Sequence, residues 1–589
     1  MTRKGRVSVA GGAAYDRRMA TLPRNADIAD QFDLLADLME LDGAESFRVL
    51  AYRRAATRMR ETSGSVAQLA LDGKAKELPG IGKTIEEKIV QYVQTGEIEA
   101  LAKKKAGVPP EVVDFMHLPG LGPKTAARIW RELGVTTVAD LKAAAEQERL
   151  RTLTGLGAKS EEKILKALAF QAENPDTGRR LLGIGLPAVQ EAVAALREHP
   201  SAVHVSEAGS VRRRKETFRD LDVIATATDP PALTAYFTEL PWVLEVTAHG
   251  DTKATVVSSE GLRFDLRVVP PESYGNLLQH FTGSKDHNVA MREEAVRRGL
   301  SISEYGVTTV ESGEIFKTED EDALYEFLGY QPIPPELRED NGELEAARRG
   351  ELPALVQLSQ VRGDLHTHTQ WSADGKNTLD EMVDAAVARG YAYYAITDHS
   401  HYLRDGRLHA QLEEIERVRE RHPKLIILAG VEANIRTSGE VDVDEADLKL
   451  LDWVVASVHQ AQETRPTERV LAAMENPYVD CIGHLTGRRI GTRGPRDVDV
   501  ERVLAKALET GVFLEINGQP DRLDLSGVHA RAAKEAGVKL VVSSDAHQIR
   551  AQGYVELAVA QARRGWLTKD DVVNTRTWAQ VGKLRRKRP

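Results

Sequence analysis

The chain has 589 residues, of which 42% are hydrophobic and 29% charged, and its formal net charge is −10. This is the composition of a soluble protein with several domains, because a chain of this length is too long for one hydrophobic core. No apolar run approaches the roughly 20 residues that span a bilayer, and the single cysteine, Cys481, lies in an apolar run, which excludes disulfides and indicates a reducing cytoplasm.

Basic residues are concentrated in a few segments although the total charge is negative. Residues 1–24 are basic and lack an apolar signal core, so we predict a flexible extension there. Arg212 to Lys215 and a tail over 576–589 are basic as well. Because local patches rather than the net charge decide nucleic-acid binding, a nucleic acid remains a candidate partner.

From residue 25 to about 105, apolar residues recur at helical spacing and predict a small helical domain. Three similar segments, LPGIGKTIEEKI, LPGLGPKTAARI and LTGLGAKSEEKI, each carry two glycines before a helix that begins near a cation. Such a turn directs free backbone N–H groups at a phosphate without reading bases. One copy can be a simple turn between helices, but three copies favour DNA binding. They resemble helix-hairpin-helix motifs, two of them in a second helical domain over 106–175, with the glycine pairs Gly80 and Gly82, Gly120 and Gly122, and Gly155 and Gly157.

Two carboxylates follow a cationic loop in the stretch GSVRRRKETFRDLD, which ends at Asp222. If residues 221–226 form a strand, its period of two places Asp220 and Asp222 on one face, and a third acid, Asp265, lies in another apolar run. Three acids on neighbouring strands can hold two divalent cations about 4 Å apart, and oxygen ligands favour Mg²⁺ or Mn²⁺. The alternative is a surface turn. In the loop, the candidate phosphate-binding residues are Gly209, Ser210, Arg212 and Arg213.

With this order of motifs the chain resembles the family X DNA polymerases, which include DNA polymerase beta. The resemblance implies a palm over 176–270, in which Asp220, Asp222 and Asp265 bind the two catalytic metal ions and Ser210 and Arg213 hold the nucleotide's triphosphate. It also implies a nucleotide-closing thumb over 271–330, with nucleotide contacts from His280, Phe281, Gly283, Asn288 and Arg292. His280, Lys285 and Arg219 depart from residues common in the family, which leaves sugar discrimination open.

In the same family, the counterpart of Lys88 is a Schiff-base nucleophile that removes a 5′-deoxyribose phosphate, and Tyr52 matches another residue of that lyase site. A Schiff-base lysine needs a lowered pKa, whereas Glu86 and Glu87 precede Lys88 and act in the opposite direction. The alternative is a helix lysine that contacts a phosphate, and both interpretations stay open.

Residues 331–360 are rich in proline and charge and predict an interdomain linker. Over 361–575, short apolar strands alternate with helical stretches, which predicts a parallel α/β barrel, TIM-like but distorted. A barrel gathers the carboxyl ends of its strands at one mouth, and acidic and imidazole side chains recur at those ends. This recurrence predicts a polynuclear metal site from His366, His368, Asp374, His399, Glu432, His459, His484, Asp545 and His547.

These nine positions resemble those of the PHP (polymerase and histidinol phosphatase) phosphoesterases. The resemblance implies one metal held by His366, His368, Glu432 and Asp545, a second by Glu432, His459 and His484, and a third by Asp374, His399 and His547. No ligand is missing, which favours hydrolysis of phosphodiesters, and mixed imidazole and carboxylate ligands suit Mn²⁺, Zn²⁺ or Fe²⁺ better than Mg²⁺. A loop beyond His484 offers candidate phosphate clamps, or else salt-bridged surface residues, at Arg488, Arg489 and Arg493.

We therefore expect a multidomain, bacterial-type repair polymerase, with helix-hairpin-helix domains, an α+β nucleotidyltransferase palm and a PHP barrel. We expect a cytoplasmic, nucleoid-associated monomer that fills short gaps in gapped or nicked DNA from dNTPs. Its barrel would be a metal-dependent 3′→5′ exonuclease or phosphoesterase, with cleavage at abasic sites as a further candidate activity that the sequence leaves open. Two rival hypotheses are a small-molecule phosphoesterase with a degenerate polymerase half, and a non-catalytic scaffold that binds DNA ends.

Overall fold

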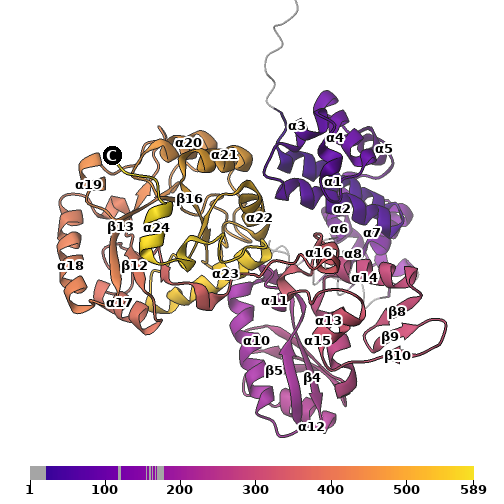
Figure 1. The fold of residues 1–589 in the computed structure, drawn as a ribbon. Coiled ribbons are helices and arrows are strands. Elements are labelled where there is room, and N and C mark those ends of the chain that lie inside the picture. Colours follow the sequence, from indigo (N-terminus) through magenta and orange to yellow (C-terminus); the bar gives the residue numbers. More distant parts are fainter. Residues whose placement is uncertain are drawn as a thin grey trace, which may run out of the picture.

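The computed structural model describes residues 22–116, 121–153, 156–157, 161, 164–165, 168 and 178–589. Figure 1 shows a helical lobe, a lobe built on an open sheet, and a barrel that contacts both. This arrangement confirms the predicted fold class of helical, palm and barrel parts. Among the described residues, every helix is too short or too polar to cross a membrane.

The helical lobe consists of short helices whose apolar faces meet in one core. Its helices are α1 (Asn25–Leu41), α2 (Ser46–Glu61), α3 (Val66–Leu71), α4 (Lys83–Thr95), α5 (Glu99–Gly107), α6 (Val113–Met116), α7 (Pro123–Leu133) and α8 (Val138–Glu146). Ile28 and Phe32 on α1 are fully buried, as their helical spacing predicts. The same core continues through Phe115 and Leu141, so the two predicted helical domains share it.

The palm is an open five-stranded sheet with helices on both faces. In spatial order the strands are β2 (Ala202–Glu207), β4 (Asp220–Ala227), β7 (Arg263–Val268), β6 (Lys253–Ser258) and β5 (Val243–Gly250). The strands β4 and β7 run parallel, and the other neighbours run antiparallel. One face packs against α10 (Leu182–Arg197) and α12 (Pro230–Thr238). The short helix α11 (Gly209–Arg212) precedes β4, and β1 (Arg180–Leu181) pairs with β3 (Thr217–Phe218).

The thumb covers the opposite face of this sheet through α13 (Tyr274–Thr282), whose Tyr274 and Leu277 pack on Ile224 of β4. It continues with α14 (Lys285–Arg297), a three-stranded sheet of β8 (Leu300–Ser303), β9 (Gly306–Thr309) and β10 (Ile315–Phe316), and α15 (Glu321–Phe327).

The segment 331–360, predicted as a linker, connects the sheet lobe to the barrel but is packed along much of its length. It contains α16 (Glu343–Arg349), and Leu337 and Leu355 are buried in the same core as Tyr325 of the thumb. Arg338 is 1% exposed and pairs with Glu321. The segment 331–360 is therefore a folded connector rather than a free chain, although it is rich in proline and charged residues.

The barrel is a seven-stranded parallel sheet in chain order. Its strands are β11 (Gly363–Asp364), β12 (Tyr393–Ile396), β13 (Ile426–Asn434), β14 (Trp453–Ser457), β15 (Cys481–Ile482), β16 (Phe513–Asn517) and β17 (Leu540–Ser543). A parallel bridge between Thr367 and Ala546 links the segments that follow the first and last strands, so the barrel is nearly closed. The outer helices are α17 (Leu379–Ala388), α18 (Arg407–Arg421), α19 (Glu445–Leu448), α20 (Pro466–Glu475), α21 (Val500–Thr510), α22 (Gly527–Ala536) and α23 (Val555–Arg564).

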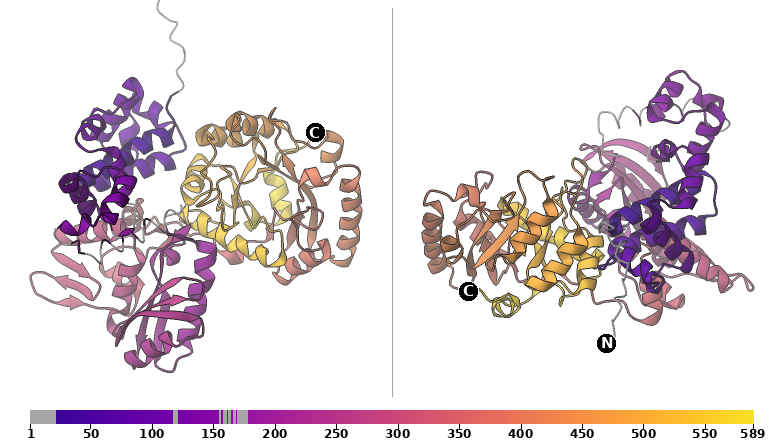
Figure 2. Two further views of the ribbon diagram at one scale, coloured as in Figure 1. Left: turned by 180° about the vertical axis from the view of Figure 1, so that it is seen from behind. Right: turned by 90° about the horizontal axis from the view of Figure 1, so that it is seen from above.

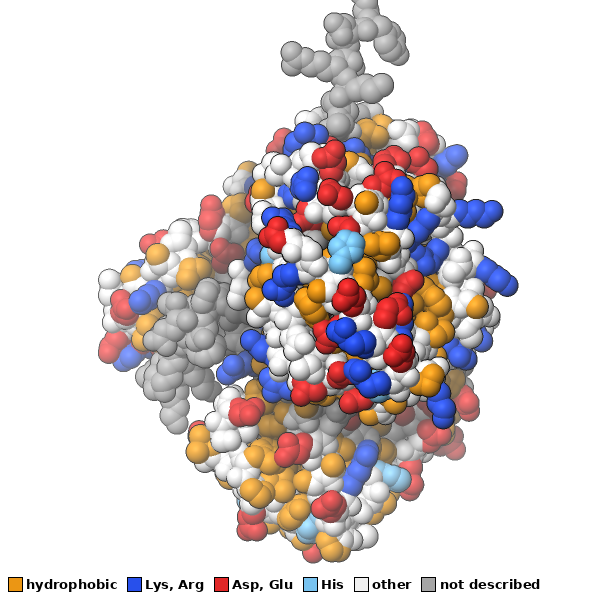
Figure 3. Space-filling view, turned by 90° about the vertical axis from the view of Figure 1, so that its left-hand side faces the viewer, with side chains coloured by type: hydrophobic (Ala, Val, Ile, Leu, Met, Phe, Trp, Pro, Cys, Tyr) orange, Lys and Arg blue, Asp and Glu red, His pale blue; other side chains and the backbone are white. Residues whose placement is uncertain are grey.

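Alternate residues of the strands fill the barrel interior. Tyr393, Trp453 and Phe513 pack there with Cys481, which is buried and unpaired as predicted. The last helix, α24 (Trp578–Leu584), adds Trp578 next to Tyr393 and Trp453. Side chains of both charges are intermixed on the outer face of the barrel, the side away from the other lobes (Figure 3).

The barrel also contacts the helical lobe, where α2 lies beside α22 (Figures 1 and 2). Arg58 of α2 donates to Glu535 of α22 (3.0 Å), and Arg531 of α22 donates to the carbonyl of Asn341 in the connector (3.1 Å). The helical lobe is therefore held by ion pairs to the barrel as well as by its chain connection to the palm.

Candidate active sites

The three palm acids lie side by side on β4 and β7. Asp222 is opposite Asp265 in the parallel register, and Asp220 shares the face of Asp222. Burial, together with the charges of Asp265 and Asp220, raises the pKa of Asp222 to about 7. Acids at this spacing repel one another when ionised, and a divalent cation between them would remove that repulsion. An all-oxygen donor set of this kind fits Mg²⁺ or Mn²⁺.

The loop before β4 approaches these acids closely. Gly209 has a φ of +63°, and a Cβ there would lie 2.1 Å from Oδ2 of Asp222, so the approach requires glycine. Ser210 and Arg213 line a cavity of about 460 Å³ together with Asp220 and Asp222. Three more cations that the sequence patterns did not assign to it also line this cavity: Arg179, Lys215 and Arg219.

The residues of the predicted nucleotide-closing segment cluster where α13 meets α14. Asn288 donates from Nδ2 to the carbonyl of His280 (2.7 Å), and Nη2 of Arg292 lies 3.1 Å from Nδ1 of the same imidazole. The ring of Phe281 lies next to that of His280, with 5.2 Å between centroids. A Cβ on Gly283 would lie 2.6 Å from Oδ1 of Asn288, so a larger residue here would displace the Asn288 side chain.

At the mouth of the barrel, the predicted ligands come from the carboxyl ends of most of its strands. Glu432 is the common neighbour: its Oε2 lies 2.7 Å from Nδ1 of His399 and 3.4 Å from Nε2 of His366. Its Oε1 lies 3.0 Å from Nε2 of His484 and 3.2 Å from Nε2 of His459. Although burial opposes ionisation, these imidazoles hold the pKa of Glu432 well below its usual range.

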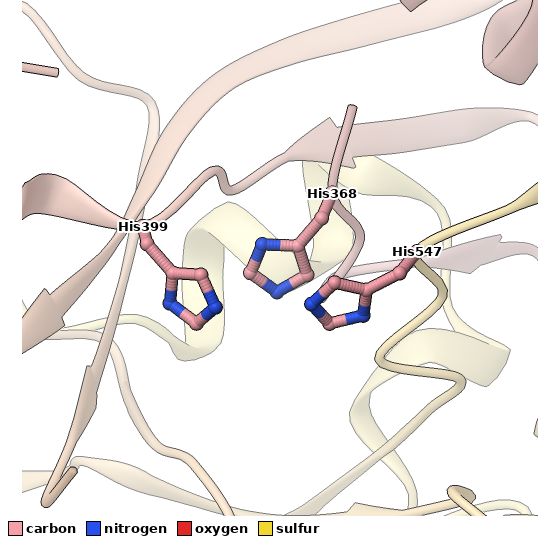
Figure 4. Close-up of side chains that lie close together, drawn as sticks. All are labelled: His368, His399 and His547. Atoms are coloured by element: carbon pink, nitrogen blue, oxygen red, sulfur yellow. The ribbon is translucent and has the colours of Figure 1, made fainter. Parts of the chain in front are cut away.

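Two aspartates join the other histidines to this group. Oδ1 of Asp545 lies 3.3 Å from Nε2 of His368, and Oδ2 of Asp374 lies 3.3 Å from Nε2 of His547 and 3.5 Å from Nε2 of His399. Figure 4 shows the rings of His368, His399 and His547 side by side, supplied by different segments of the chain. All nine predicted residues therefore converge.

Several buried nitrogen and oxygen atoms of these residues make no hydrogen bond of suitable geometry among the described residues, although some lie close to one another: Nε2 of His366, Nε2 of His368, Nδ1 of His399, Nδ1 of His484 and Oε2 of Glu432. Buried polar atoms normally have partners, and imidazole nitrogens and carboxylates are metal ligands. Three overlapping sets have ligand atoms within 4.8 Å of one another: His366, His368 and Glu432; His368, His399 and His547; and His399, Glu432 and His459. The residues thus fit a centre of more than one metal ion.

Outer contacts orient these imidazoles. Nδ1 of His366 lies 2.6 Å from Oε1 of Glu515, and Nδ1 of His459 lies 2.6 Å from Oδ1 of Asn434. Because both acceptors are oxygens that only accept, Nδ1 carries the proton in each ring and Nε2 is left to bind a metal. Neither Glu515 nor Asn434 is among the residues predicted from the sequence. Glu515 is the middle residue of the strand β16 (FLEIN) rather than a residue at its carboxyl end, so the pattern of strand ends did not mark it.

Four segments match known families: residues 23–98 a helix-hairpin-helix domain, residues 112–169 a SAM-like helix-hairpin-helix tandem, residues 277–339 the DNA polymerase beta thumb, and residues 364–558 the PHP domain. The chain is 38% identical over 566 residues to the DNA polymerase/3′-5′ exonuclease PolX of Bacillus subtilis (strain 168), an alignment that covers 94% of this chain and 98% of that protein. The chain belongs to the PolX family. The barrel alone is also similar to several probable phosphatases.

Among these is a probable phosphatase of Thermoanaerobacter sp. (strain X514), 36% identical over 242 residues, which covers 38% of this chain and 92% of that protein. A probable phosphatase of Acetivibrio thermocellus is 33% identical over 195 residues, covering 31% of this chain and 78% of that protein. The match to PolX covers 94% of this chain, whereas the matches to these two phosphatases cover 38% and 31% of it.

In this member of the PolX family, helices begin directly after two of the hairpin glycines that the structure describes. Gly80 has a φ of +81° and forms a turn, Gly82 precedes α4, and Gly122 precedes α7. The free N–H groups of a first helical turn are suited to bind a phosphate. Of the other predicted hairpin glycines, Gly157 is described, and Gly120 and Gly155 lie outside the described residues.

The predicted lyase residue of this PolX family member, Lys88, is half-buried on α4, with its Nζ 5.9 Å from the centre of the Tyr52 ring. Glu86 is engaged elsewhere, since it accepts the N–H of Lys76 (2.9 Å). Schiff-base chemistry at Lys88 stays a prediction, and borohydride trapping on an oligonucleotide with an abasic site tests it.

The three arginines beyond His484 make protein contacts in the PolX barrel. Arg489 pairs with Asp521, Arg493 donates to the carbonyl of Gly487 (2.6 Å), and Arg488 reaches the palm. A further arginine lies closer to the metal ligands. Nε of Arg522 is 3.9 Å from Oδ2 of Asp545, and this residue was not predicted because it follows the strand β16 by several positions.

Proposed function

We propose that this chain is a DNA polymerase that fills short gaps in gapped or nicked DNA and that its barrel is a 3′→5′ exonuclease. One observation supports this most: the acidic and imidazole residues that the two reactions require are complete in a single PolX family chain. We further propose that it acts as a monomer.

In the palm, Asp220, Asp222 and Asp265 would hold two Mg²⁺ or Mn²⁺ ions, with Asp265 nearest the primer end. When bound, such ions would supply activation of the primer 3′-hydroxyl and neutralisation of charge on the leaving pyrophosphate. Ser210 and Arg213 bind the triphosphate, and the glycine at position 209 lets the loop backbone approach it. The cluster of His280, Phe281, Gly283, Asn288 and Arg292 bounds the sugar and base.

In the barrel, Mn²⁺, Zn²⁺ or Fe²⁺ would be held by the nine residues at the mouth and would supply a hydroxide nucleophile near neutral pH. Glu515 and Asn434 hold two of the ligand imidazoles in the tautomer that binds metal. Arg522, beside Asp545, binds a non-bridging oxygen of the scissile phosphate.

Two assays with one preparation test this proposal. The first is primer extension on a gapped duplex, and the second is release of nucleotides from a labelled 3′ end, each with and without EDTA. Incorporation and release that both require metal are expected. Gap binding that survives chelation without incorporation would favour the scaffold hypothesis, and faster turnover of a small phosphomonoester than of DNA would favour the phosphoesterase hypothesis.

A further inference from the structure

The barrel contacts the palm behind the loop that lines the palm cavity. Arg564, the last residue of α23, donates from Nη1 to the carbonyl of Arg213 (2.8 Å). Gln561, one turn earlier, donates from Nε2 to the carbonyl of Arg214 (3.3 Å). Two residues of the exonuclease half therefore fix consecutive backbone carbonyls in the phosphate-binding loop of the polymerase half.

The same guanidinium also holds a largely buried carboxylate of the connector, whose side chain is 12% exposed. Glu339 Oε1 accepts from Nη1 of Arg564 (3.0 Å) and from Nε of Arg213 (3.0 Å), and its Oε2 lies 3.6 Å from Nζ of Lys215. Although burial opposes ionisation, these three cations hold the pKa of Glu339 well below its usual range. One carboxylate thus joins the barrel, the connector and the palm.

The two palm cations of this group also line the cavity. Arg213 uses Nε for Glu339 and Nη1 for the carbonyl of Thr282 (2.7 Å), and both Arg213 and Lys215 line the cavity with Ser210. Because three cations surround one carboxylate here, the group keeps a surplus of positive charge beside the cavity. A nucleoside triphosphate carries the charge that this surplus would neutralise.

A second contact supports the same loop. Glu216 accepts from Nη2 (2.6 Å) and Nη1 (3.1 Å) of Arg488, whose Nε donates to the carbonyl of Arg522 (2.8 Å). Arg522 is the arginine that lies 3.9 Å from Asp545 in the barrel centre. The surface between the two halves therefore runs from one catalytic centre to the rim of the other.

We propose that Arg564 of the barrel is a positioning residue of the polymerase centre, which holds Glu339 and the backbone of Arg213 so that Arg213 and Lys215 present their charge to the nucleoside triphosphate. Without Arg564, Glu339 has one cation fewer, its pull on Arg213 and Lys215 increases, and the positive surplus at the cavity decreases. This inference rests on the proposed role of Arg213 in binding the triphosphate.

The test is steady-state gap filling by the full chain with Arg564→Gln, Arg564→Lys and Arg563→Gln. Loss of one charge-assisted contact predicts a rise of about tenfold in KM for dNTP in Arg564→Gln, with kcat within about twofold of the parent. Arg564→Lys restores part of the KM because it keeps the charge. Exonuclease activity of the same preparations stays unchanged.

Arg563→Gln is the matched control. Arg563 is the neighbouring residue on α23 and also crosses between the halves, but it donates to Glu336 (2.7 Å) and to the carbonyl of Val356 (3.1 Å) rather than to the loop. An unchanged KM in Arg564→Gln, or an equal rise in Arg563→Gln, would overturn the inference.

Two further variants separate the possible failures. If Arg564→Gln does not fold, Gln561→Ala takes its place, because it removes only a neutral hydrogen bond to the same loop. We expect this variant to raise KM for dNTP by about two- to threefold. An unchanged KM would overturn the inference. Arg213→Gln tests whether Arg213 binds the triphosphate. If KM for dNTP rises in Arg213→Gln but not in Arg564→Gln, only the positioning role of Arg564 is contradicted. If KM is unchanged in Arg213→Gln, the proposed role of Arg213 is contradicted as well.

Discussion

Nδ1 of His366 and Oε1 of Glu515 are 2.6 Å apart in the interior of the barrel, and both side chains are 1% exposed. The carboxylate is fixed in turn, because its Oε2 accepts the N–H of His484 (2.6 Å) and Nδ2 of Asn517 (3.1 Å). Glu515 thus fixes the ring of His366, a proposed metal ligand, as outer-sphere carboxylates do in metal sites.

Glu515→Gln should therefore weaken metal binding in the barrel while leaving the palm unaffected. Loss of an outer-sphere partner of a ligand histidine typically lowers metal affinity by about 10- to 100-fold. We expect exonuclease activity to require a higher Mn²⁺ concentration by that factor and to recover at saturation, with polymerase activity unchanged.

Titration of exonuclease activity with Mn²⁺ measures this effect, and Glu509→Gln, on the exposed end of α21, is the control. A parent-like Mn²⁺ dependence in Glu515→Gln would show that the ring of His366 does not need this partner.

The two centres should be separable by mutation, because their ligands belong to different sheets. Asp222→Ala removes a palm acid, and loss of several kcal/mol of metal-ion catalysis corresponds to a fall of about a thousandfold in nucleotide incorporation. His368→Ala should lower nucleotide release from 3′ ends by a similar factor. Each variant should keep the other activity within about twofold, since additivity holds for distant sites.

Primer extension and 3′-end release on the same preparations measure both effects, with circular dichroism and thermal melting as folding controls. Loss of both activities in either well-folded variant would contradict the assignment of two centres.

The strand ends were predictable because their signal is local. A parallel barrel brings the carboxyl ends of its strands to one mouth, so an acidic or imidazole residue after each apolar run is enough to place His399 and His484 there. The palm acids follow from the same kind of signal. The strand β4 (Asp220–Ala227) extends the predicted strand by one residue at each end and keeps Asp220 and Asp222 on one face.

The partners of these residues were not predictable, because they depend on contacts between segments far apart in the chain. Glu515 lies 149 residues from His366, and no spacing rule connects them. The composition of the connector predicts a linker, because composition does not show whether charged side chains are solvated or paired with other residues. Arg338 can be buried because Glu321 of the thumb and the carbonyl of Ile333 accept hydrogen bonds from it.

The basic tail is a second case in which composition conceals packing. Arg585 donates to Oδ1 of Asp480 (2.8 Å) and Arg588 donates to Oδ2 (2.6 Å), and the side chain of Asp480 is 2% exposed. Replacing both arginines with glutamine leaves this carboxylate buried without a cation, at a cost of roughly 3–5 kcal/mol in the stability of the barrel.

Thermal and denaturant unfolding of the full chain measure the loss. The matched control is the double variant of Lys583→Gln and Lys587→Gln, which removes the same formal charge from exposed positions of the same tail. Equal stability of the two double variants would show that the tail does not stabilise the barrel, and a loss of DNA affinity in both would instead assign it to DNA binding.

The contact between the helical lobe and the barrel contains a titrating acid, Glu61. Burial raises its pKa to about 7, and the charges of Glu535 and Glu343 add to the effect, while Arg531 and Arg58 oppose it. In the docked arrangement Glu61 keeps its proton up to about pH 7, whereas it would ionise above about pH 4.5 if the helical lobe and the barrel separated and exposed it to water. Rising pH across this window therefore favours undocking. For one proton, the equilibrium constant between the docked and undocked arrangements changes by at most about tenfold per pH unit.

Energy transfer between dyes on cysteines that replace the exposed Lys105 and Lys424 can follow this docking, because the native Cys481 is buried. We expect the distance between the helical lobe and the barrel to increase between about pH 5 and pH 8 in the parent chain. Glu61→Gln, which stays neutral, should remain docked throughout, so the same pH dependence in both chains would exclude Glu61 as its source. Arg60→Gln, whose guanidinium contacts Asp30 and Asp33 within the helical lobe, should keep the parent's pH dependence because it leaves Glu61 in place.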